Sequence, residues 1–229
     1  MGVSNLSAST QNYLKVIWAL QEWSDEPITA TLVSAKIGLK LSSVSDAMKK
    51  LTEQGLLDHA PYGNIALSPL GAQYALAMVR RHRLIETFLV SALAYSWDEV
   101  HDEAEHLEHA VSDLMVERMD KFLGFPTKDP HGDPIPDKEG KIVRPQAIQL
   151  AQEHVGTRVL VERISDDDPE LLKFFASQGI LVDQQLQISP GPLYSEAINV
   201  FVSPDDADSN PNAIVLGPAA MQAIWVSQF

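Results

Sequence analysis

Residues 29–67 read TATLVSAKIGLKLSSVSDAMKKLTEQGLLDHAPYGNIAL, and this stretch decides the fold of the first part of the chain. Thr29 or Thr31 can cap a helix that runs to Lys36, because a threonine hydroxyl accepts a hydrogen bond from a free N–H of the first turn. The tripeptide Ile37-Gly38-Leu39 then places a glycine where a left-handed residue is needed. The sequence therefore predicts a helix, a tight turn and the start of another helix.

The helix after this turn begins near Ser42 and has two different faces. Its apolar stripe repeats at helical spacing and consists of Leu41, Val44, Met48 and Leu51. Its opposite, polar face consists of Ser42, Ser43, Ser45, Asp46, Lys49 and Lys50. We expect the stripe to be buried and the polar face to be exposed.

Two flanking elements complete this module. Upstream, residues 10–23 carry apolar side chains at helical spacing. Downstream, residues 56–59 and 65–67 are predicted strands, joined by a turn over residues 60–64. Helices followed by a β-hairpin predict a winged helix-turn-helix domain, which we place at residues 1–71.

A polar face on the second helix of such a domain is typical of DNA binding. Small hydroxyl side chains let the backbone approach the major groove, and Lys49 and Lys50 can contact phosphates. Ser and Asp side chains can bind base edges directly or through water. The alternative is an ordinary three-helix core with a solvated face, because a glycine turn and one polar face occur in many unrelated domains.

The net charge of −14 at first argues against a nucleic-acid partner, because phosphate binding depends on Lys and Arg. The acidic residues, however, lie mostly outside the first module. Residues 1–71 carry 5 basic and 6 acidic side chains, whereas residues 72–229 carry 12 basic and 25 acidic ones. The N-terminal module is therefore nearly neutral, and its charge does not exclude DNA.

The composition also limits the compartment and the metal chemistry. The chain has no cysteine, which excludes disulfides, thiolate ligands and a thiol nucleophile. It has no 18-residue apolar run, and its first residues lack the pattern of a secretory signal, so we expect a cytoplasmic protein without membrane association. Any bound metal ion must be held by oxygen and imidazole nitrogen.

A helical block follows the first module, and we place it at residues 72–145. Helices are predicted over residues 68–93 and 101–123, and the proline-rich residues 124–145 are predicted to be a linker. The second helix carries an apolar stripe of Leu107, Val111, Leu114, Met115 and Met119. That stripe needs a partner, and a self-pairing dimer face would cover it.

The last module, residues 146–229, is predicted to be rich in β-strands. Its apolar alternation predicts strands at residues 156–164, 186–188, 197–202 and 213–216, with a short helix at residues 169–178. Several short strands in so few residues favour a small barrel.

Six His and Glu side chains of the helical block have the spacing of metal ligands. They are His82 and Glu86 on its first helix, and His101, Glu105, Glu108 and His109 on its second. At 100° per residue, the last four fall within roughly 140° of arc. Imidazole and carboxylate without thiolate suit Mn²⁺ and Fe²⁺ and also accept Zn²⁺. One alternative is a hydrated acidic helix, and another is a metallohydrolase, although the flanking Ala and Leu residues favour packing over a substrate cleft.

Three motifs in the middle of the chain resemble the diphtheria-toxin-repressor family of iron and manganese regulators. They are RRHRLIE at residues 80–86, VHDEAEHLEH at residues 100–109 and GDPIP at residues 132–136. The resemblance extends through YLKVIW at residues 13–18 and covers about residues 7–145. It implies a mainly α fold with β elements: a winged helix, a helical dimerisation and metal-binding domain, and an SH3-like small β-barrel at the C-terminus.

The resemblance also implies two metal sites. The ligands of the primary site correspond here to Asn12, Glu105, Glu108 and His109. Iron-responsive relatives carry cysteine at the place of Glu105, so a carboxylate there indicates the manganese branch. The ancillary site corresponds to His82, Glu86 and His101, completed from the SH3-like domain by Asp167 and Glu170, or by Asp168 in an alignment shifted by one residue.

Two residues depart from the pattern of the family. Manganese-responsive members usually carry Asp at the place of Asn12, and an amide oxygen without charge should bind metal more weakly. Lys15 stands where compact two-domain relatives carry a second carboxylate. We therefore expect separate primary and ancillary sites rather than a closely spaced pair of ions.

The implied function is metal-dependent repression of transcription by a homodimer on a palindromic operator. Mn²⁺ is the expected cofactor, Fe²⁺ is the alternative, and Zn²⁺ or Co²⁺ would bind in vitro. We expect the first helix and the 101–123 helix to be tied together only when an ion lies between them. No enzymatic activity and no small organic substrate are expected. The alternative within the same fold is a winged-helix regulator whose metal residues are vestigial or structural.

Overall fold

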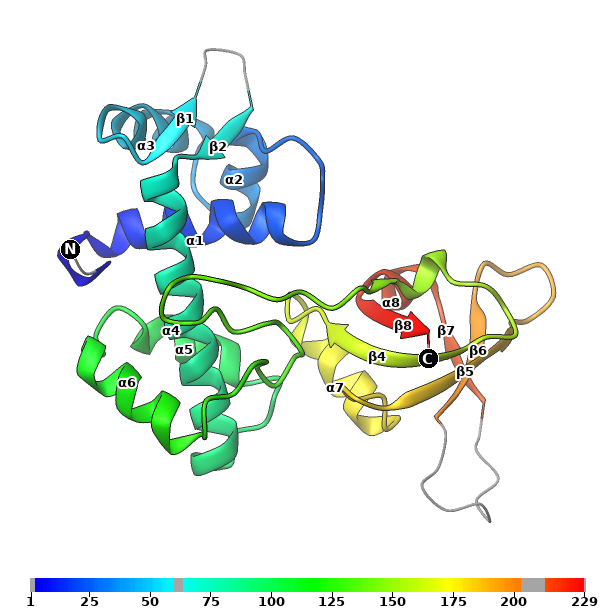
Figure 1. Ribbon diagram of the computed structural model, residues 1–229. Helices are drawn as coiled ribbons and strands as arrows, with labels where there is room; N and C mark the ends of the chain where they lie inside the picture. The colour runs from blue at the N-terminus through cyan, green and yellow to red at the C-terminus, as the bar shows by residue number, and fades with distance from the viewer. Residues whose placement is uncertain (1–2, 60–63, 203–212, 229) are drawn as a thin grey trace. The chain divides into compact units, whose positions relative to one another are not determined.

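The computed structural model describes residues 3–59, 64–202 and 213–228 (Figure 1). The chain forms two compact units, and each is described by itself. The N-terminal unit consists of Met1–Ile85, Ala104–Phe125 and Ile135–Ile142, and the C-terminal unit consists of Glu86–Glu103, Pro126–Pro134 and Val143–Phe229. Except for Asn64, the predicted turn at residues 60–64 lies outside the described residues.

The N-terminal unit begins with the predicted winged helix-turn-helix, shown in blue and cyan in Figure 1. Its elements are η1 (Val3–Asn5), α1 (Ala8–Glu22), α2 (Ala30–Ile37), α3 (Leu41–Glu53), β1 (Leu57–His59) and β2 (Ile65–Leu67). β1 and β2 pair antiparallel, with Leu57 opposite Leu67. The order of helices and hairpin confirms the fold class predicted for this module.

Local chemistry explains where these helices begin and end. Ser7 and Thr29 cap α1 and α2, because their hydroxyl oxygens accept hydrogen bonds from N–H groups of the first turn. Gly38 ends α2 in the left-handed conformation, with a φ of 75°. The glycine in the predicted turn is thus explained by backbone geometry.

The core of this module is formed by the apolar faces of its helices and hairpin. Its buried members are Tyr13, Leu14, Ile17, Ile28, Val33, Val44, Met48, Leu51, Leu56, Leu57, Ile65 and Ala75. Three of the four residues of the stripe predicted on α3 are among them. The prediction is wrong for Leu41, which is 48% exposed because it is the first residue of α3 and lies outside this core.

The helix α4 (Pro69–Leu93) has the predicted bounds to within one residue. Ser68 Oγ accepts a hydrogen bond from Gly71 N–H at 3.0 Å and so caps its first turn. A Cβ at position 71 would lie 1.9 Å from the carbonyl oxygen of Leu56, so only glycine allows α4 to pack this closely against the backbone just before β1.

The predicted helix over residues 101–123 is wrong as a single element. The chain forms α5 (Val100–Leu107) and α6 (Asp113–Phe122) instead. Ser112 explains the break, because its side chain accepts a hydrogen bond from Met115 N–H and caps α6 as a new helix. Glu108 and His109 therefore lie in the turn after α5, and not in the middle of a long helix.

Residues 124–145 contain no helix and no strand, as their prolines indicate, apart from one isolated bridge between Lys128 and Pro134. The segment is nevertheless packed, because residues 131–136 are all buried. Gly132 has a φ of 89°, and a Cβ there would lie 2.0 Å from the carbonyl oxygen of Glu162. The domain boundaries at residues 71 and 145 remain predictions.

The C-terminal unit contains a six-stranded antiparallel sheet in the order β3-β8-β4-β5-β6-β7. The strands are β3 (Ile148–Gln149), β4 (Arg158–Ile164), β5 (Gln185–Pro190), β6 (Ile198–Val202), β7 (Ile214–Leu216) and β8 (Ile224–Gln228), and the helical elements within its last part are η2 (Leu150–Gln152), α7 (Pro169–Ser177) and α8 (Pro218–Gln222). This sheet is consistent with the expected SH3-like domain. The sequence did not predict β3 and β8, although β8 pairs with both β3 and β4.

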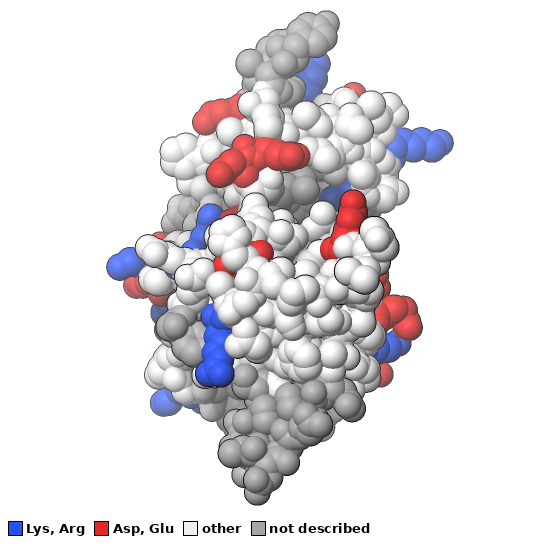
Figure 2. All heavy atoms as spheres, turned by 90° about the vertical axis from the view of Figure 1, so that its right-hand side faces the viewer, with Lys and Arg blue, Asp and Glu red and all other residues white. Residues whose placement is uncertain are grey.

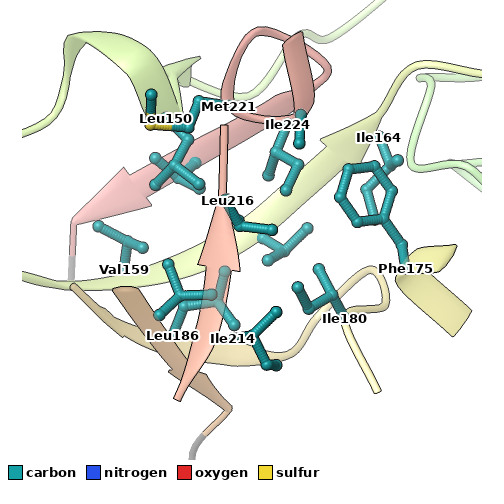
Figure 3. Close-up of a cluster of buried hydrophobic side chains, with 14 of the residues drawn as sticks. Leu150, Val159, Ile164, Phe175, Ile180, Leu186, Ile214, Leu216, Met221 and Ile224 are labelled. Carbon is teal, nitrogen blue, oxygen red and sulfur yellow. The ribbon is translucent and has the colours of Figure 1, made fainter. Parts of the chain in front are cut away.

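One apolar core holds this sheet and its helices together (Figure 3). Phe175 of α7 points into the same cluster as Ile164, Leu186 and Ile224 from three different strands, and all four are fully buried. A regular alternation of buried and exposed residues along β5 supplies this face of the sheet.

Charged side chains of both signs are scattered over the face of the molecule shown in Figure 2, with wide uncharged areas between them. The excess of acidic residues is therefore not gathered into one patch on that face. Among the described residues, no helix has the length and apolar character required to cross a membrane.

Candidate metal centre

The first candidate site lies within the N-terminal unit and is built on three helices. Lys15 comes from α1, His82 from α4 and Glu105 from α5, and Glu108 follows α5 directly. Lys15 Nζ lies 2.6 Å from Glu105 Oε1 and 2.7 Å from Glu108 Oε1. His82 Nδ1 lies 2.6 Å from Glu108 Oε2. The structure therefore brings together three of the residues predicted to bind metal, and it adds a lysine.

Burial and charge set the ionisation of Glu108 in this cluster. Burial by itself would raise the pKa of this carboxyl group, but the hydrogen bond with His82 and the charge of Lys15 outweigh it and lower the pKa. Glu108 is completely buried. A buried carboxylate kept in its charged form is a suitable metal ligand.

His109 lies at the same site, and Gln11, which precedes Asn12 on α1, orients its ring. Gln11 Nε2 donates to the carbonyl oxygens of Val3 and Leu6 at 3.0 and 3.1 Å, which fixes the orientation of its amide. Its Oε1 therefore accepts a hydrogen bond from His109 Nδ1 at 2.6 Å. This assigns the ring proton to Nδ1 and leaves the lone pair on His109 Nε2, which is 3.5 Å from Glu108 Oε1.

Two of the residues predicted as ligands of the primary site have a buried polar atom that lacks a hydrogen-bond partner. Among the described residues, Asn12 Oδ1 and His109 Nε2 are buried and have no hydrogen-bond partner. Burying a polar atom without a partner is costly, so such atoms usually face a ligand or an ordered water molecule. An amide oxygen, a carboxylate and an imidazole nitrogen form a donor set that fits a divalent first-row ion.

The second candidate site lies within the C-terminal unit. Its first part consists of Glu86 near the end of α4, His101 on α5 and Asp166 after β4, with ligand atoms that all lie within 4.8 Å of one another. His101 Nδ1 lies 2.8 Å from Asp166 Oδ2 and 3.3 Å from Glu86 Oε1. His82, the other predicted member, stands one helical turn before Glu86 on α4.

The electrostatics of this second site are those of buried carboxylates facing imidazole rings. Burial by itself would lower the pKa of His101, but the hydrogen bonds with Asp166 and Glu86 outweigh it and raise the pKa to about 11. Burial would raise the pKa of Asp166, and the hydrogen bond with His101 and the charges of His101, His131 and Arg163 hold it well below its usual value.

Two further residues of the second site, Asp129 and His131, were not predicted from the sequence. Glu86, Asp129 and His131 offer three further ligand atoms within 4.8 Å of one another, and all three residues are buried. His131 Nε2 donates to the carbonyl oxygen of Trp97 at 2.7 Å, whereas its Nδ1 is buried without a hydrogen-bond partner among the described residues. The motif DPHGD at residues 129–133 was the available signal, because it places Asp and His beside a glycine.

The residues expected to complete the second site from the SH3-like domain have other partners in the structure. Asp167 Oδ2 accepts a hydrogen bond from Ser165, Asp168 caps α7, and Glu170 is exposed and pairs with Lys173. Asp166, one residue earlier, is the carboxylate that contacts His101. Of these neighbouring acidic residues, only Asp166 joins the second cluster.

The predicted DNA-binding residues lie together on α3. Ser42, Ser43, Ser45, Asp46, Lys49 and Lys50 are all exposed, and α3 is the second helix of the helix-turn-helix. A winged helix with an exposed polar recognition face, joined to a helical part that carries clusters of carboxylate and imidazole groups, defines a class of protein: a DNA-binding regulator that responds to a metal ion.

Comparisons with known proteins agree with this class. Residues 5–65 match the model of the iron dependent repressor N-terminal DNA binding domain, and residues 68–137 match the model of the iron dependent repressor metal binding and dimerisation domain. The iron-dependent repressor IdeR of Mycobacterium leprae is 27% identical over 202 residues, which cover 83% of this chain and 87% of the relative.

Two solved structures extend the comparison over nearly the whole chain. A manganese-dependent transcriptional repressor in complex with manganese is 49% identical, with a TM-score of 0.89, and the match covers 96% of this chain and 100% of that one. The structure of ScaR with bound Zn²⁺ is 29% identical, with a TM-score of 0.78, over 96% and 99% of the two chains. The chain belongs to the diphtheria-toxin-repressor family of metal-dependent transcriptional repressors. The two matched domains indicate a homodimer that binds DNA.

Proposed function

We propose that this protein is a manganese-dependent repressor that binds a palindromic operator as a homodimer, and that the first candidate site is its sensing site. One observation carries this proposal: His109 Nε2, which lies 3.5 Å from the Glu108 carboxylate, and Asn12 Oδ1, one turn before Lys15 on α1, are both buried and have no hydrogen-bond partner. An ion bound there would supply the positive charge and the coordination positions that join α1 to the turn after α5.

The choice of ion rests on the ligands. The chain has no cysteine, and the site offers an amide oxygen, carboxylates and imidazole, which suit Mn²⁺ or Fe²⁺ better than a thiolate-preferring ion. A relative of 49% identity was solved in complex with manganese, which also favours Mn²⁺. Zn²⁺ and Co²⁺ would bind in vitro, because affinity follows the Irving–Williams order rather than the identity of the physiological ion.

We propose that the second candidate site is an ancillary metal site with Glu86, Asp129, His131, His101 and Asp166 as its ligands. The unpartnered Nδ1 of His131 and the two buried carboxylate side chains of Glu86 and Asp129 in the same cluster support this use. The hydrogen bond from His131 Nε2 to the Trp97 carbonyl orients the ring, as the outer partner of a metal-binding histidine commonly does.

DNA recognition is assigned to the polar face of α3. Lys49 and Lys50 are exposed and can contact phosphates, and the hydroxyl groups of Ser42, Ser43 and Ser45 are small enough to allow close approach to the major groove. The hairpin of β1 and β2 follows α3 directly and would form the wing.

The dimer face is assigned to α6 and the residues after it. Leu114, Met115 and Phe122 are exposed on α6 and fall within about 100° of arc, and Phe125 next to them is 62% exposed. Exposed apolar side chains gathered in this way indicate an interface, and a second copy of the chain would cover them. The description of the matched domain as a dimerisation domain supports this occupant.

Repression then depends on thermodynamic linkage. A metal ion that binds the DNA-competent arrangement of α1 more tightly than the other arrangement shifts the population toward it, and operator DNA must tighten metal binding by the same factor. We infer a regulatory rather than a catalytic use of the metal.

The test is an operator-binding assay with the full chain in Mn²⁺ and in chelator. We expect operator affinity to rise with Mn²⁺ and Glu105→Ala to lose this response while its metal-free dimer remains folded. Equal operator affinity in manganese and in chelator would contradict metal sensing and favour a vestigial or structural metal site. Metal-dependent hydrolysis of a phosphate or carboxylic ester would support the metallohydrolase hypothesis instead.

A further inference from the structure

Lys15 occupies the centre of the first candidate site. Its side chain is only 10% exposed, and its Nζ lies 2.6 Å from Glu105 Oε1 and 2.7 and 2.8 Å from the two oxygens of Glu108. His82 Nδ1 is 3.4 Å from the same nitrogen. An ammonium group thus lies against the carboxylate and imidazole groups that the proposed function assigns to a metal ion.

This ion pair changes the expected coupling between helices. The sequence-based expectation that α1 and α5 are tied together only by an ion is wrong, because Lys15 on α1 joins Glu105 on α5 directly and without an ion. Asn12 stands three residues earlier on α1, and its buried Oδ1 has no hydrogen-bond partner. Lys15 thus attaches α1 to α5 directly, whereas Asn12 is the residue of α1 that the proposed ion would bind.

We propose that Lys15 is a tethered cation that holds the Glu105 and Glu108 carboxylates together in the metal-free protein and competes with the divalent ion for them. The inference rests on the proposed function, and it adds that the sensor responds only above a threshold concentration of the metal ion. The reason is electrostatic: the same carboxylate oxygens cannot be close neighbours of an ammonium group and ligands of a divalent ion without strong repulsion between the two cations.

Two consequences follow for the metal-free and metal-bound states. Without the ammonium group, the metal-free protein would bury Glu108 beside Glu105 with less compensating charge, so Lys15 stabilises the metal-free fold. Metal binding requires the ammonium group to leave the carboxylates, so Lys15 weakens the affinity for the ion. Lys15 thereby sets the metal concentration at which the sensor responds.

The experiment measures Mn²⁺ binding to the full chain by calorimetry. All variants carry Glu86→Gln, because Glu86 belongs to both parts of the second site and its removal isolates the first. Lys15→Met replaces the ammonium group by an apolar side chain of similar length. Lys138→Met is the matched control, because it makes the same change of charge at an exposed position of the same unit, away from α6.

We expect Lys15→Met to bind Mn²⁺ at least tenfold more tightly than the parent, with one ion at this site, and Lys138→Met to match the parent. Thermal unfolding gives a second measurement: metal-free Lys15→Met should melt below the parent, and saturating Mn²⁺ should remove the difference. Lys15→Arg keeps the charge and should remain close to the parent in both measurements.

The outcomes separate this inference from the proposed function. If the parent binds Mn²⁺ and Lys15→Met binds it equally or more weakly, the competition is refuted and the proposed function stands. If the parent binds no Mn²⁺ but Lys15→Met does, Lys15 blocks the site, so the inference is supported and the proposed function is contradicted. If neither binds, both are contradicted.

Discussion

Gln11 Oε1 accepts a hydrogen bond from His109 Nδ1 at 2.6 Å, across 98 residues of sequence. The amide nitrogen of Gln11 donates to the carbonyl oxygens of Val3 and Leu6, and these two hydrogen bonds fix the orientation of the amide oxygen. The ring of His109 is thereby fixed as the tautomer with its lone pair on Nε2, the atom that has no partner at the proposed sensing site.

The first prediction concerns this orientation. We expect Gln11→Leu to weaken Mn²⁺ binding by about 10- to 100-fold, the usual effect of losing an outer partner of a metal-binding histidine. Nitrogen-15 NMR of the metal-free protein should show His109 protonated on Nδ1 in the parent and mixed tautomers in the variant. An unchanged tautomer in the variant would show that Gln11 does not fix the ring.

The second prediction separates two neighbouring acidic residues. Asp166 contacts His101 in the second cluster, whereas Asp167 accepts a hydrogen bond from Ser165. In calorimetry on the full chain, Asp166→Asn should lower Mn²⁺ affinity at the second site by tenfold or more, because a charged ligand is lost, and Asp167→Asn should change it little. A larger loss of Mn²⁺ affinity for Asp167→Asn than for Asp166→Asn would assign the site to the residues expected from the sequence.

The third prediction concerns the packing of the segment that carries Asp129 and His131. Gly132→Ala combines a left-handed backbone with a Cβ only 2.0 Å from the carbonyl oxygen of Glu162, and we expect it to destabilise the protein by about 2 kcal/mol or more. Gly156→Ala is the control, because Gly156 has a φ of 99° but no atom near its Cβ position. The free energy of unfolding is measured with denaturant. Equal losses for the two variants would contradict the close approach of Gly132 to the Glu162 carbonyl.

The fourth prediction addresses the DNA face. Lys49 is exposed on α3, and Lys49→Ala should weaken binding to all sequences about equally and lower the salt dependence of log K by about one unit. Lys173→Ala, on α7 of the C-terminal unit, is the control and should leave that slope unchanged. The measurement is the affinity for operator and non-operator DNA over a series of salt concentrations. Identical slopes of log K for the parent and Lys49→Ala would show that Lys49 does not contact a phosphate.

The fifth prediction tests the dimer face. Phe122 is 68% exposed on α6, and Phe122→Asp should convert the dimer to a monomer, because a charge in an apolar interface is desolvated without a partner. Light scattering after size-exclusion chromatography measures the mass. Val143→Asp, at a position of similar exposure, should remain dimeric. A dimeric Phe122→Asp would place the interface elsewhere.

The sequence by itself determined the elements whose signals are local. The winged helix follows from apolar spacing, the cap at Thr29 and the glycine at position 38, because each acts within a few residues of the chain. The ligand types were also available, since a chain without cysteine restricts a metal ion to oxygen and nitrogen. Helical spacing alone, however, joined α5 and α6 into one helix, because it carries no information on the competing cap at Ser112.

Only the tertiary structure decided which residues meet. Lys15 lies 90 residues from Glu105, Gln11 lies 98 from His109, and Asp166 lies 65 from His101, so no periodicity could pair them. Such contacts depend on how helices and loops pack, and packing responds to the whole core rather than to any one segment. The tertiary structure therefore determined that a lysine contacts the carboxylates of the proposed sensing site. It also determined that Asp166, rather than its acidic neighbours, contacts His101.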